Sequence, residues 1–423
     1  QLVANGELYG YEGQRQELLA RGHVLRTAGD SEVALHLYEE EGARGLDRLR
    51  GEFALVIWDE RQQRLFAARD RFGIKPLFYA RAGGALFVAS EVKALLAAGV
   101  PAAWDQESVH HLLTLGVQLP GRTLFAGVRQ VPPGHYLEAE GASERLVRWW
   151  DLDYPPAAPR PWTGEEEAAA VERLRAALDE SVRLRLRADV PVGCYLSGGV
   201  DSSAVLGLAA RHAGVLKAFT VAFDQDGYDE SPLAEESARR AGAEWCPIRV
   251  GQQDLADHFA DSVWHSETAC KNAHGVAKFI LSGHVQRSGF KVVLTGEGSD
   301  EILAGYHAST PTPNGEATAG DPAQPPGWVR GNLANARTHR GLLRAEFAEA
   351  HAGEDAYARL LGALDVEGQL QGRSRIDQEL YLWTKTVLTN YILTVGGDRT
   401  EMAHSVEGRP PFLDHHVFAA TRA

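Results

Sequence analysis

The run Leu196–Ser203, which reads Leu-Ser-Gly-Gly-Val-Asp-Ser-Ser, constrains the fold of this chain more than any other feature. The short apolar stretch before it, Val190–Tyr195, is typical of a buried strand in a parallel sheet. The stretch after it, Ala204–Ala210, predicts a helix. The run is therefore expected at a strand-to-helix turn, where glycines let the backbone approach an anion and the free N–H groups of the helix start face it.

Asp201 within this run adds a second constraint, because a carboxylate repels phosphates unless a Mg²⁺ ion lies between them. The run has neither the lysine nor the spacing of the Walker loop. It resembles the pyrophosphate-binding loop of ATP pyrophosphatases, which adenylate a substrate and release pyrophosphate. An ordinary Gly/Ser turn is the alternative. The residues that the resemblance assigns to ATP are Leu196, Ser197, Gly198, Gly199, Asp201, Ser202 and Ser203.

A second acidic loop, Gly296–Glu301, follows another apolar stretch, Lys291–Leu294. Because ligands in such sheets bind at the carboxyl ends of the strands, we expect both loops at the same edge. Asp300 would then lie opposite Asp201 as a second Mg²⁺ ligand, since this ion prefers oxygen donors. Glu297 is placed where a general base would meet an incoming amine. A solvated acidic turn is the alternative.

Further positions extend the predicted nucleotide site. Val221 and Phe223 end a strand and are placed to flank an adenine, with a plain core position as the alternative for Phe223. Thr295 and Gly296 begin the second loop and are also assigned to ATP. Arg399 is a candidate for stabilising the charge of a leaving pyrophosphate, and a surface salt bridge is its alternative.

The first part of the chain has a different hydrophobic periodicity. Residues 1–153 predict an antiparallel, β-rich α+β domain. It contains a hairpin from Phe53–Trp58 to Arg64–Arg69 and a helix over Ser31–Glu41, with Ser31 as the helix cap.

Residues 154–163 are rich in proline and are predicted to link this domain to residues 164–423. In the second part, strands and helices alternate as in an α/β doubly wound parallel sheet, and the chain from about residue 329 is mainly helical. Residues 309–328 read as a mobile loop or spacer.

Composition excludes several classes of protein. The chain has 423 residues, of which 44% are hydrophobic and 24% charged, as in a globular protein with an ample core. The net charge of -14, without a basic stripe, excludes a nucleic-acid partner. No apolar run reaches membrane-spanning length, so no membrane partner is expected. Three cysteines without metal or disulfide spacing fit a reducing, cytoplasmic location.

Two short loops in the first part carry carboxylates at positions suited to an amino-acid ligand. Asn5-Gly6-Glu7 and Gly29–Glu32 could hold its α-amino and carboxamide groups, and an exposed turn is the alternative for each. Together with the loops above, these motifs resemble the glutamine-dependent asparagine synthetases of the bacterial B type over essentially the whole chain. Asp70–Leu77 is close to a hallmark of that family, and Val406–Asp414 matches its synthetase half.

The resemblance implies a class II glutamine amidotransferase of the Ntn-hydrolase fold, joined to an ATP-pyrophosphatase-type synthetase domain. An N-terminal Cys would hydrolyse glutamine, which Asn5, Gly6, Glu7 and Asp30 would hold. Ammonia would pass through an apolar tunnel to the second site. There a carboxylate would attack the α-phosphorus of Mg-ATP, and ammonia would displace AMP with Glu297 as the base.

The chain departs from this family pattern at several points. Its earliest cysteine is Cys194, so we expect the nucleophile upstream of Gln1, and the alternative is that glutaminase activity is lost. We also expect the family's C-terminal end beyond the last residue. The segment Glu267–Ser282 differs from that of the aspartate-using enzymes. Candidates for contacting a different acceptor carboxylate are Asn272, His274 and Lys278, and a helix start with solvated charges is the alternative.

Several functions remain open at this point. The default is asparagine synthesis from aspartate, and one variant amidates another carboxylic acid in natural-product or polysaccharide biosynthesis. An intramolecular amide former resembling β-lactam synthetase is disfavoured, because that enzyme has a Tyr at the position of Glu297. A non-catalytic regulatory relative is disfavoured by Asp201 and Asp300. A homodimer is a candidate assembly.

Overall fold

The structure, a computed structural model, describes residues 1–156, 163–225, 227–306 and 319–422. The chain forms two compact units, and neither is a continuous half of the sequence. The first unit combines Gln1–Gly6, Phe53–Trp162 and Ala304–Tyr391, and the second combines Glu7–Glu52, Thr163–Leu303 and Ile392–Ala423.

Two predicted connecting segments fall partly on undescribed residues. Of the predicted linker, residues 157–162 lie outside the described residues, and so do residues 309–318 of the predicted spacer. The predicted domain boundary at 154–163 therefore stays a prediction.

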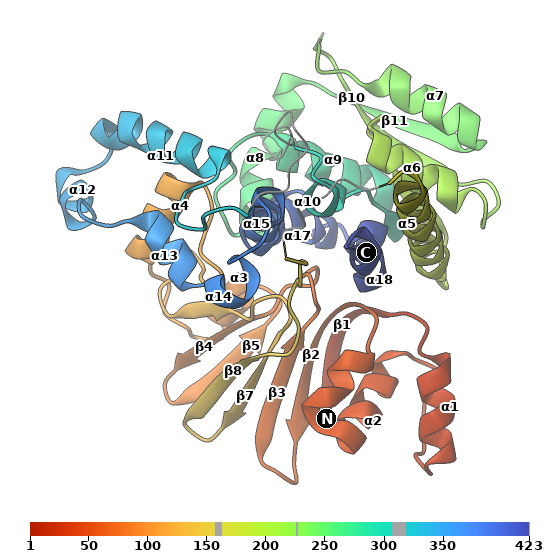
Figure 1. Ribbon diagram of the computed structural model, residues 1–423, viewed down its shortest axis with the longest axis horizontal. Coiled ribbons are helices and arrows are strands. Elements are labelled where there is room, and N and C mark those ends of the chain that lie inside the picture. Colours follow the sequence, from red (N-terminus) through yellow and green to blue (C-terminus); the bar gives the residue numbers. More distant parts are fainter. Residues whose placement is uncertain (157–162, 226, 307–318, 423) are drawn as a thin grey trace. The chain divides into compact units, whose positions relative to one another are not determined.

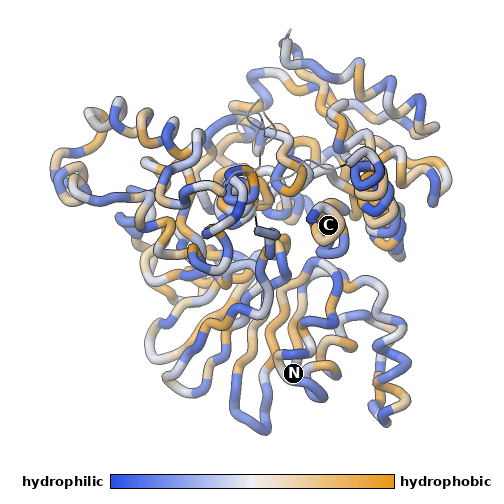
Figure 2. Tube along the Cα trace, in the orientation of Figure 1, coloured by the Kyte–Doolittle hydropathy of each residue, from blue (hydrophilic) through white to orange (hydrophobic). Residues whose placement is uncertain are grey.

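The first unit is built on antiparallel sheets, as the sequence predicts. Its larger sheet has the strand order β1-β2-β3-β7-β8, and its smaller sheet the order β5-β4-β6. The hairpin of β2 and β3 pairs Ile57 with Phe66, which confirms the predicted hairpin (Figure 1). Figure 2 shows hydrophobic residues along β2 and β3 and hydrophilic residues at the turn between them. The strands are β1 (Leu2–Leu8), β2 (Gly51–Asp59), β3 (Arg64–Arg69), β4 (Phe78–Ala82), β5 (Ala85–Ala89), β6 (Val128–Gln130), β7 (His135–Glu140) and β8 (Ser143–Arg148). The last two residues of β1 and the first two of β2 belong to the second unit.

The hallmark run Asp70–Leu77 has a structural explanation within this unit. The buried Asp70 carboxylate accepts hydrogen bonds from the N–H groups of Phe72, Ile74 and Lys75, each at 3.0 Å. Burial raises the pKa of Asp70, and these hydrogen bonds oppose the rise. A carboxylate at this position therefore fixes the turn after β3.

Helices complete the first unit. The stretch from residue 329 is mainly helical, as predicted. The helices of the first unit are α3 (Val92–Ala97), α4 (Gln106–Leu115), α11 (Gly327–His339), the 3₁₀ turn η3 (Arg340–Leu342), α12 (Ala345–Ala350), α13 (Ala356–Gly362), α14 (Val366–Gln369), α15 (Arg375–Trp383) and the π-helix η4 (Thr384–Ile392). The last residue of η4 belongs to the second unit.

The second unit contains a five-stranded, fully parallel sheet, which confirms the predicted α/β architecture. Its order is β11-β10-β9-β12-β13, and α7 packs on β10 and β11 (Figure 1). The sequence analysis missed two of its strands: β11 lies at the sheet edge and contains Pro247, which weakens a strand pattern, and β13 has only three residues, two of them charged. The strands are β9 (Val192–Tyr195), β10 (Lys217–Phe223), β11 (Glu244–Val250), β12 (Val292–Leu294) and β13 (Glu407–Arg409).

The second unit also contains the remaining helices of the described chain. One prediction is wrong: Asp30, and not Ser31, caps α2, because its carboxylate accepts the N–H of Ser31. No helix in the described part of the chain combines the length and the apolar character that crossing a bilayer requires. The helices are α1 (Glu12–Ala20), α2 (Ser31–Glu41), η1 (Gly42–Arg48), α5 (Gly164–Arg185), α6 (Val200–Ala209), α7 (Ser231–Ala241), α8 (Gln252–Ser266), α9 (His274–Arg287), α10 (Ser299–Leu303), α16 (Leu393–Val395), α17 (Asp398–Met402), η5 (Pro411–Leu413) and α18 (His415–Thr421).

Candidate active site

The glycine-rich run forms the turn between a central strand and a helix. β9 ends at Tyr195, as the sequence predicts. The helix α6 begins at Val200, four residues before the predicted helix Ala204–Ala210, so Asp201 lies in its first turn. Gly198 has a φ of 88°, which favours glycine, and a Cβ there would lie 2.9 Å from the carbonyl oxygen of Glu230. Both the backbone conformation and the space therefore require glycine, and helix geometry leaves the first N–H groups of α6 without intrahelical partners, as an anion site needs.

Hydroxyl groups hold this turn together. Ser197 Oγ lies 3.1 Å from Ser202 Oγ and accepts the N–H of Gly199 at 3.2 Å. Ser203 Oγ instead donates to Ser237 Oγ on α7, at 3.1 Å. The turn is thus fixed by its own side chains before any ligand binds, which reduces the ordering that a bound phosphate would require.

The two acidic loops lie together at the carboxyl ends of β9 and β12. A Cβ on Gly296 would lie 3.0 Å from the backbone N of Ser202 and 3.3 Å from Asp201 Cβ, so glycine allows this close approach. Burial raises the pKa of Asp300, and the negative charge of Asp201 raises it further. Two neighbouring carboxylates of like charge are a suitable donor set for a divalent cation such as Mg²⁺.

The remaining predicted ATP contacts lie on neighbouring strands. The N–H of Leu196 donates to the carbonyl oxygen of Phe219 at 2.9 Å, which aligns the end of β9 with β10. Val221 is partly buried two residues further along β10. Thr295 directly follows β12, and its N–H donates to the carbonyl oxygen of Arg409 at 3.1 Å.

Glu297 lies beside a buried cation. Lys278 Nζ, presented by α9, lies 2.6 Å from Glu297 Oε1 and 3.2 Å from Glu401 Oε1, and it sits over the ring of Tyr195. Although burial opposes ionisation, the Lys278 ammonium holds the pKa of Glu297 below its ordinary value. Glu297 is therefore ionised at neutral pH, the state that a general base requires.

Glu401 is a functional candidate that the sequence analysis missed. Burial raises its pKa to about 7 despite the Lys278 ammonium, and the charge of Glu297 adds to the rise. It lies on α17, two residues after Arg399, whereas Glu297 lies more than one hundred residues away in the sequence. No local pattern could have paired the two carboxylates, because α9 supplies the lysine that joins them.

Arg399 is buried, and its guanidinium forms an ion pair with Glu267. Glu267 ends α8 with a left-handed φ of 54°. A guanidinium carries five N–H donors, so this pairing does not by itself exclude a phosphate contact. The role of Arg399 at pyrophosphate stays a prediction.

The three candidates for the acceptor lie at the start of α9. Asn272 Oδ1 accepts the N–H of His274 at 3.1 Å, and both residues are exposed. Lys278 lies about one turn further on, where it meets Glu297. An acceptor carboxylate at Lys278 would thus share this cation with the predicted base.

The predicted glutamine-binding residues lie on β1 and before α2. Asn5 and Gly6 lie on β1, where Gly6 has a φ of 132°. Asp30 Oδ2 accepts the N–H of Leu8 at 2.6 Å, which joins the start of α2 to the end of β1. Burial raises the pKa of Glu7 to about 7, although Arg409 lies 3.2 Å away.

Cys194 is unsuited to act as the nucleophile for glutamine hydrolysis. It lies on β9 and is fully buried. Burial raises the pKa of its thiol to about 12, so the thiolate is scarcely populated at neutral pH.

Comparisons with known proteins agree with both halves of this picture. A family model described as asparagine synthase matches residues 173–423, and one described as a glutamine amidotransferase domain matches residues 1–150. A Penicillium rubens protein described as amidase chyE is 36% identical, and the match covers 98% of this chain and 69% of that protein. A Gibberella zeae protein described as amidase chry2 is 33% identical over the same shares. A Mycobacterium bovis protein described as a putative glutamine-hydrolysing asparagine synthetase is 34% identical, over 99% of this chain and 68% of that protein.

Proposed function

Because this chain belongs to the asparagine synthase family of glutamine-hydrolysing ligases, we propose that it adenylates a substrate carboxylate with ATP and converts it to an amide. The nitrogen is ammonia derived from glutamine. The carboxylate attacks the α-phosphorus and releases pyrophosphate, and ammonia then displaces AMP from the acyl-adenylate. The observation that carries this proposal is the close approach of Gly296 to Asp201 and Ser202, which brings the glycine-rich turn and the second acidic loop to one edge of the sheet.

The two aspartates are proposed to hold Mg²⁺ with the triphosphate. Their donor set fits this ion, because Asp201 and Asp300 offer carboxylate oxygens, and burial together with the charge of Asp201 raises the pKa of Asp300. Mg²⁺ bound there would neutralise the phosphate charge that develops during attack. Ser197 and the N–H groups at the start of α6 position the phosphate oxygens of ATP.

Glu297 is proposed as the base of the second step. Its carboxylate accepts a proton from the attacking amine, and Lys278 keeps it ionised until then. Glu401 shares the same ammonium and has a pKa of about 7, so it is suited to take up part of the charge change when Glu297 is protonated.

Two classes of acceptor are carried forward. Aspartate is the default, which would make the chain an asparagine synthetase like the 34% identical mycobacterial relative. A different carboxylic acid is favoured by two observations: the exposed Asn272 and His274 at the start of α9, and two relatives of 36% and 33% identity that are described as amidases. We further propose a cytoplasmic location and a homodimer. All three cysteines are free, which fits a reducing compartment.

The test supplies ATP, Mg²⁺ and ammonia directly with each candidate acid, so that only the synthetase reaction is examined. Pyrophosphate release identifies the acid that is adenylated, and mass spectrometry identifies the amide. Asp201→Asn serves as the inactive control. The absence of pyrophosphate with aspartate would exclude asparagine synthesis, and its absence with every acid would contradict the proposed reaction.

A further inference from the structure

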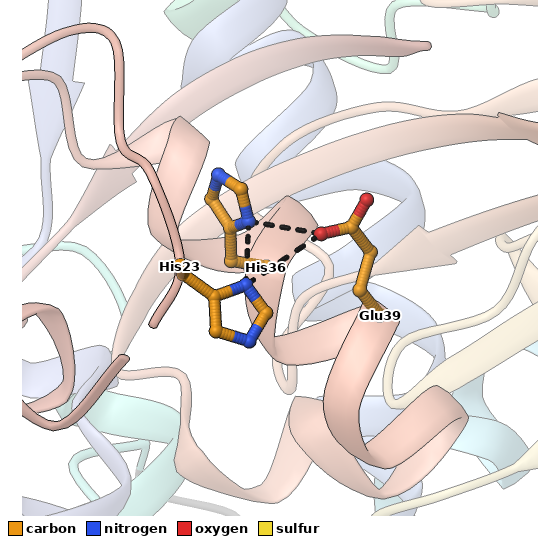
Figure 3. Close-up of side chains that lie close together, drawn as sticks. All are labelled: His23, His36 and Glu39. Carbon is orange, nitrogen blue, oxygen red and sulfur yellow. Dashed lines mark hydrogen bonds and ion pairs between the residues drawn. The ribbon is translucent and has the colours of Figure 1, made fainter. Parts of the chain in front are cut away.

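Two histidines and a glutamate face one another on α2 and the segment before it. His23 lies between α1 and α2, whereas His36 and Glu39 lie on α2 (Figure 3). The Nδ1 atoms of the two histidines are 3.0 Å apart. Glu39 Oε2 lies 2.9 Å from His36 Nδ1 and 3.7 Å from His23 Nδ1. Three potential ligand atoms therefore form a small triangle.

This triangle has the dimensions of one face of a tetrahedral zinc site. Zinc bonds of about 2.0–2.2 Å to nitrogen and oxygen separate neighbouring ligand atoms by roughly 3.3–3.5 Å. The three measured separations lie on both sides of that range. The imidazole planes of His23 and His36 are inclined by 78°, so in-plane lone pairs of both rings can converge on one ion.

A second layer of carboxylates supports the two imidazoles. His23 Nε2 lies 2.8 Å from Glu40 Oε1, and Glu40 is itself held by Arg21 at 3.2 Å. His36 Nε2 faces Glu32 Oε1 at 3.8 Å. A metal-binding histidine commonly donates its other N–H to a carboxylate, which fixes the tautomer that leaves the ligating nitrogen unprotonated. The arrangement around His23 has this form, with Nδ1 directed into the triangle.

We propose that His23, His36 and Glu39 bind a divalent transition-metal ion of the zinc class, at a site separate from the proposed ATP and glutamine sites. Both histidine side chains are largely buried, but Glu39 is 54% exposed, so a fourth coordination position is open to water. The ion would fasten the segment after α1 to α2. That loop carries Asp30, whose carboxylate holds the end of β1 through Leu8, so the metal would stabilise the predicted glutamine-binding region.

A second histidine cluster in the first unit supplies an internal control. His110, His351 and Glu354 also lie close together, but the rings of His110 and His351 are stacked at 4.5 Å with only 8° between their planes. In-plane lone pairs of parallel stacked rings cannot both point at one ion about 2 Å away. His110 Nε2 is also 3.9 Å from the carboxylate of Glu354. We therefore expect no comparable metal binding there.

The test titrates the full chain, after removal of metals by a chelator, with Zn²⁺ by calorimetry and with Co²⁺ by its visible absorption. We expect one equivalent to bind, with a tetrahedral cobalt spectrum. His36→Gln is expected to weaken binding at least 100-fold, and Glu40→Gln, which leaves the ligands intact, by about 10- to 100-fold. His351→Gln, the same substitution in the other cluster, is expected to leave binding unchanged.

Glu39→Gln provides a ligand variant at an exposed side chain if His36→Gln does not fold, and circular dichroism of the metal-free proteins checks this. Zn²⁺ is expected to raise the thermal midpoint of the wild type but not of the ligand variants. The proposal is overturned if the wild type binds no stoichiometric metal, or if neither ligand variant weakens binding. Loss of binding in His351→Gln would place the ion in the other cluster and would equally overturn it.

Discussion

Two charged clusters of the second unit use carboxylates in opposite ways. In the first, the fully buried guanidinium of Arg185 lies 3.2 Å from Glu52 and 3.0 Å from Asp414, and it also donates to Ser181 Oγ. In the second, the carboxylates of Asp201 and Asp300 are neighbours of like charge. The Arg185 cluster compensates its charges within the protein, whereas the described residues form no ion pair with Asp201 or Asp300.

This difference distinguishes charged residues that stabilise the fold from charged residues that bind a ligand. A buried charge is tolerated when partners satisfy it, and removing one partner is strongly destabilising. A pair of like charges weakens the folded state slightly, and it is expected where a ligand of opposite charge supplies the compensation. The motif Val406–Asp414 belongs to the first kind, since Asp414 forms a fully buried ion pair with Arg185, and the buried Arg409 pairs with the partly exposed Glu407.

The largest effect on activity is expected when one aspartate of the pair Asp201 and Asp300 is replaced. Asp201→Asn and Asp300→Asn should each lower pyrophosphate release by at least about 10²–10³-fold, because each removes a carboxylate proposed to hold the Mg²⁺ that would stabilise the transition state. Their free energies of unfolding should equal or exceed that of the wild type, because the repulsion is relieved. Pyrophosphate assays and urea unfolding check both parts, and a variant that keeps full activity would remove the metal assignment.

Replacing the cation of the first cluster should lower the stability of the fold, whereas the aspartate variants should keep or raise it. Arg185→Met should lower the free energy of unfolding by about 3–5 kcal/mol, because Glu52 and Asp414 then lie buried without their shared guanidinium. The matched control is Arg187→Met, at an exposed arginine nearby, with an expected loss below about 1 kcal/mol. If Arg185→Met and Arg187→Met lost equal free energies of unfolding in urea, the buried ion pairs of Arg185 would contribute no more stability than the exposed pair of Arg187.

Glu297→Ala should separate the two chemical steps. ATP–pyrophosphate exchange should persist in part, because Glu297 is not a proposed metal ligand, while amide formation should fall by about 10²–10⁴-fold. Isotope exchange measures the first step, and mass spectrometry of the amide measures the second. Equal losses in both steps would mean that Glu297 is not a dedicated base.

The smallest effect concerns pH and Glu7. Its pKa is raised to about 7 in the folded protein from an ordinary value of 4.5, so the folded state binds more protons than the unfolded state between these values. The stability that protonated Glu7 contributes is full below about pH 4.5 and is lost as the pH rises through 7. Glu7→Gln should therefore unfold at higher urea than the wild type above pH 7, and the difference should vanish near pH 4.5. A constant difference across this range would contradict the assignment.

Local sequence was sufficient for the turns at the sheet edge. Leu196–Ser203 and Gly296–Glu301 each follow an apolar strand, so their place in a parallel sheet could be predicted without knowing the strand order. The family and the enzyme class predicted from these motifs are confirmed by the matches to residues 1–150 and 173–423.

Ion pairs between residues far apart in the sequence could not be predicted from local sequence patterns. Arg185 meets Glu52 and Asp414, and Lys278 meets Glu401, across more than one hundred residues of sequence. The prediction of the N-cap of α2 was wrong for a local reason, because two adjacent residues, Asp30 and Ser31, are both good helix caps. The roles of Asn5, Arg399 and the acceptor candidates stay predictions.

The most direct test of the central claim is the fate of ATP. With Mg²⁺, ammonia and an accepted acid, the wild type should produce one AMP and one pyrophosphate for each amide formed, as nucleotide chromatography and a pyrophosphate assay can measure. This result follows from attack at the α-phosphorus beside Asp201 and Asp300. Production of ADP and inorganic phosphate instead would contradict the account, because the bond would then break at the γ-phosphorus.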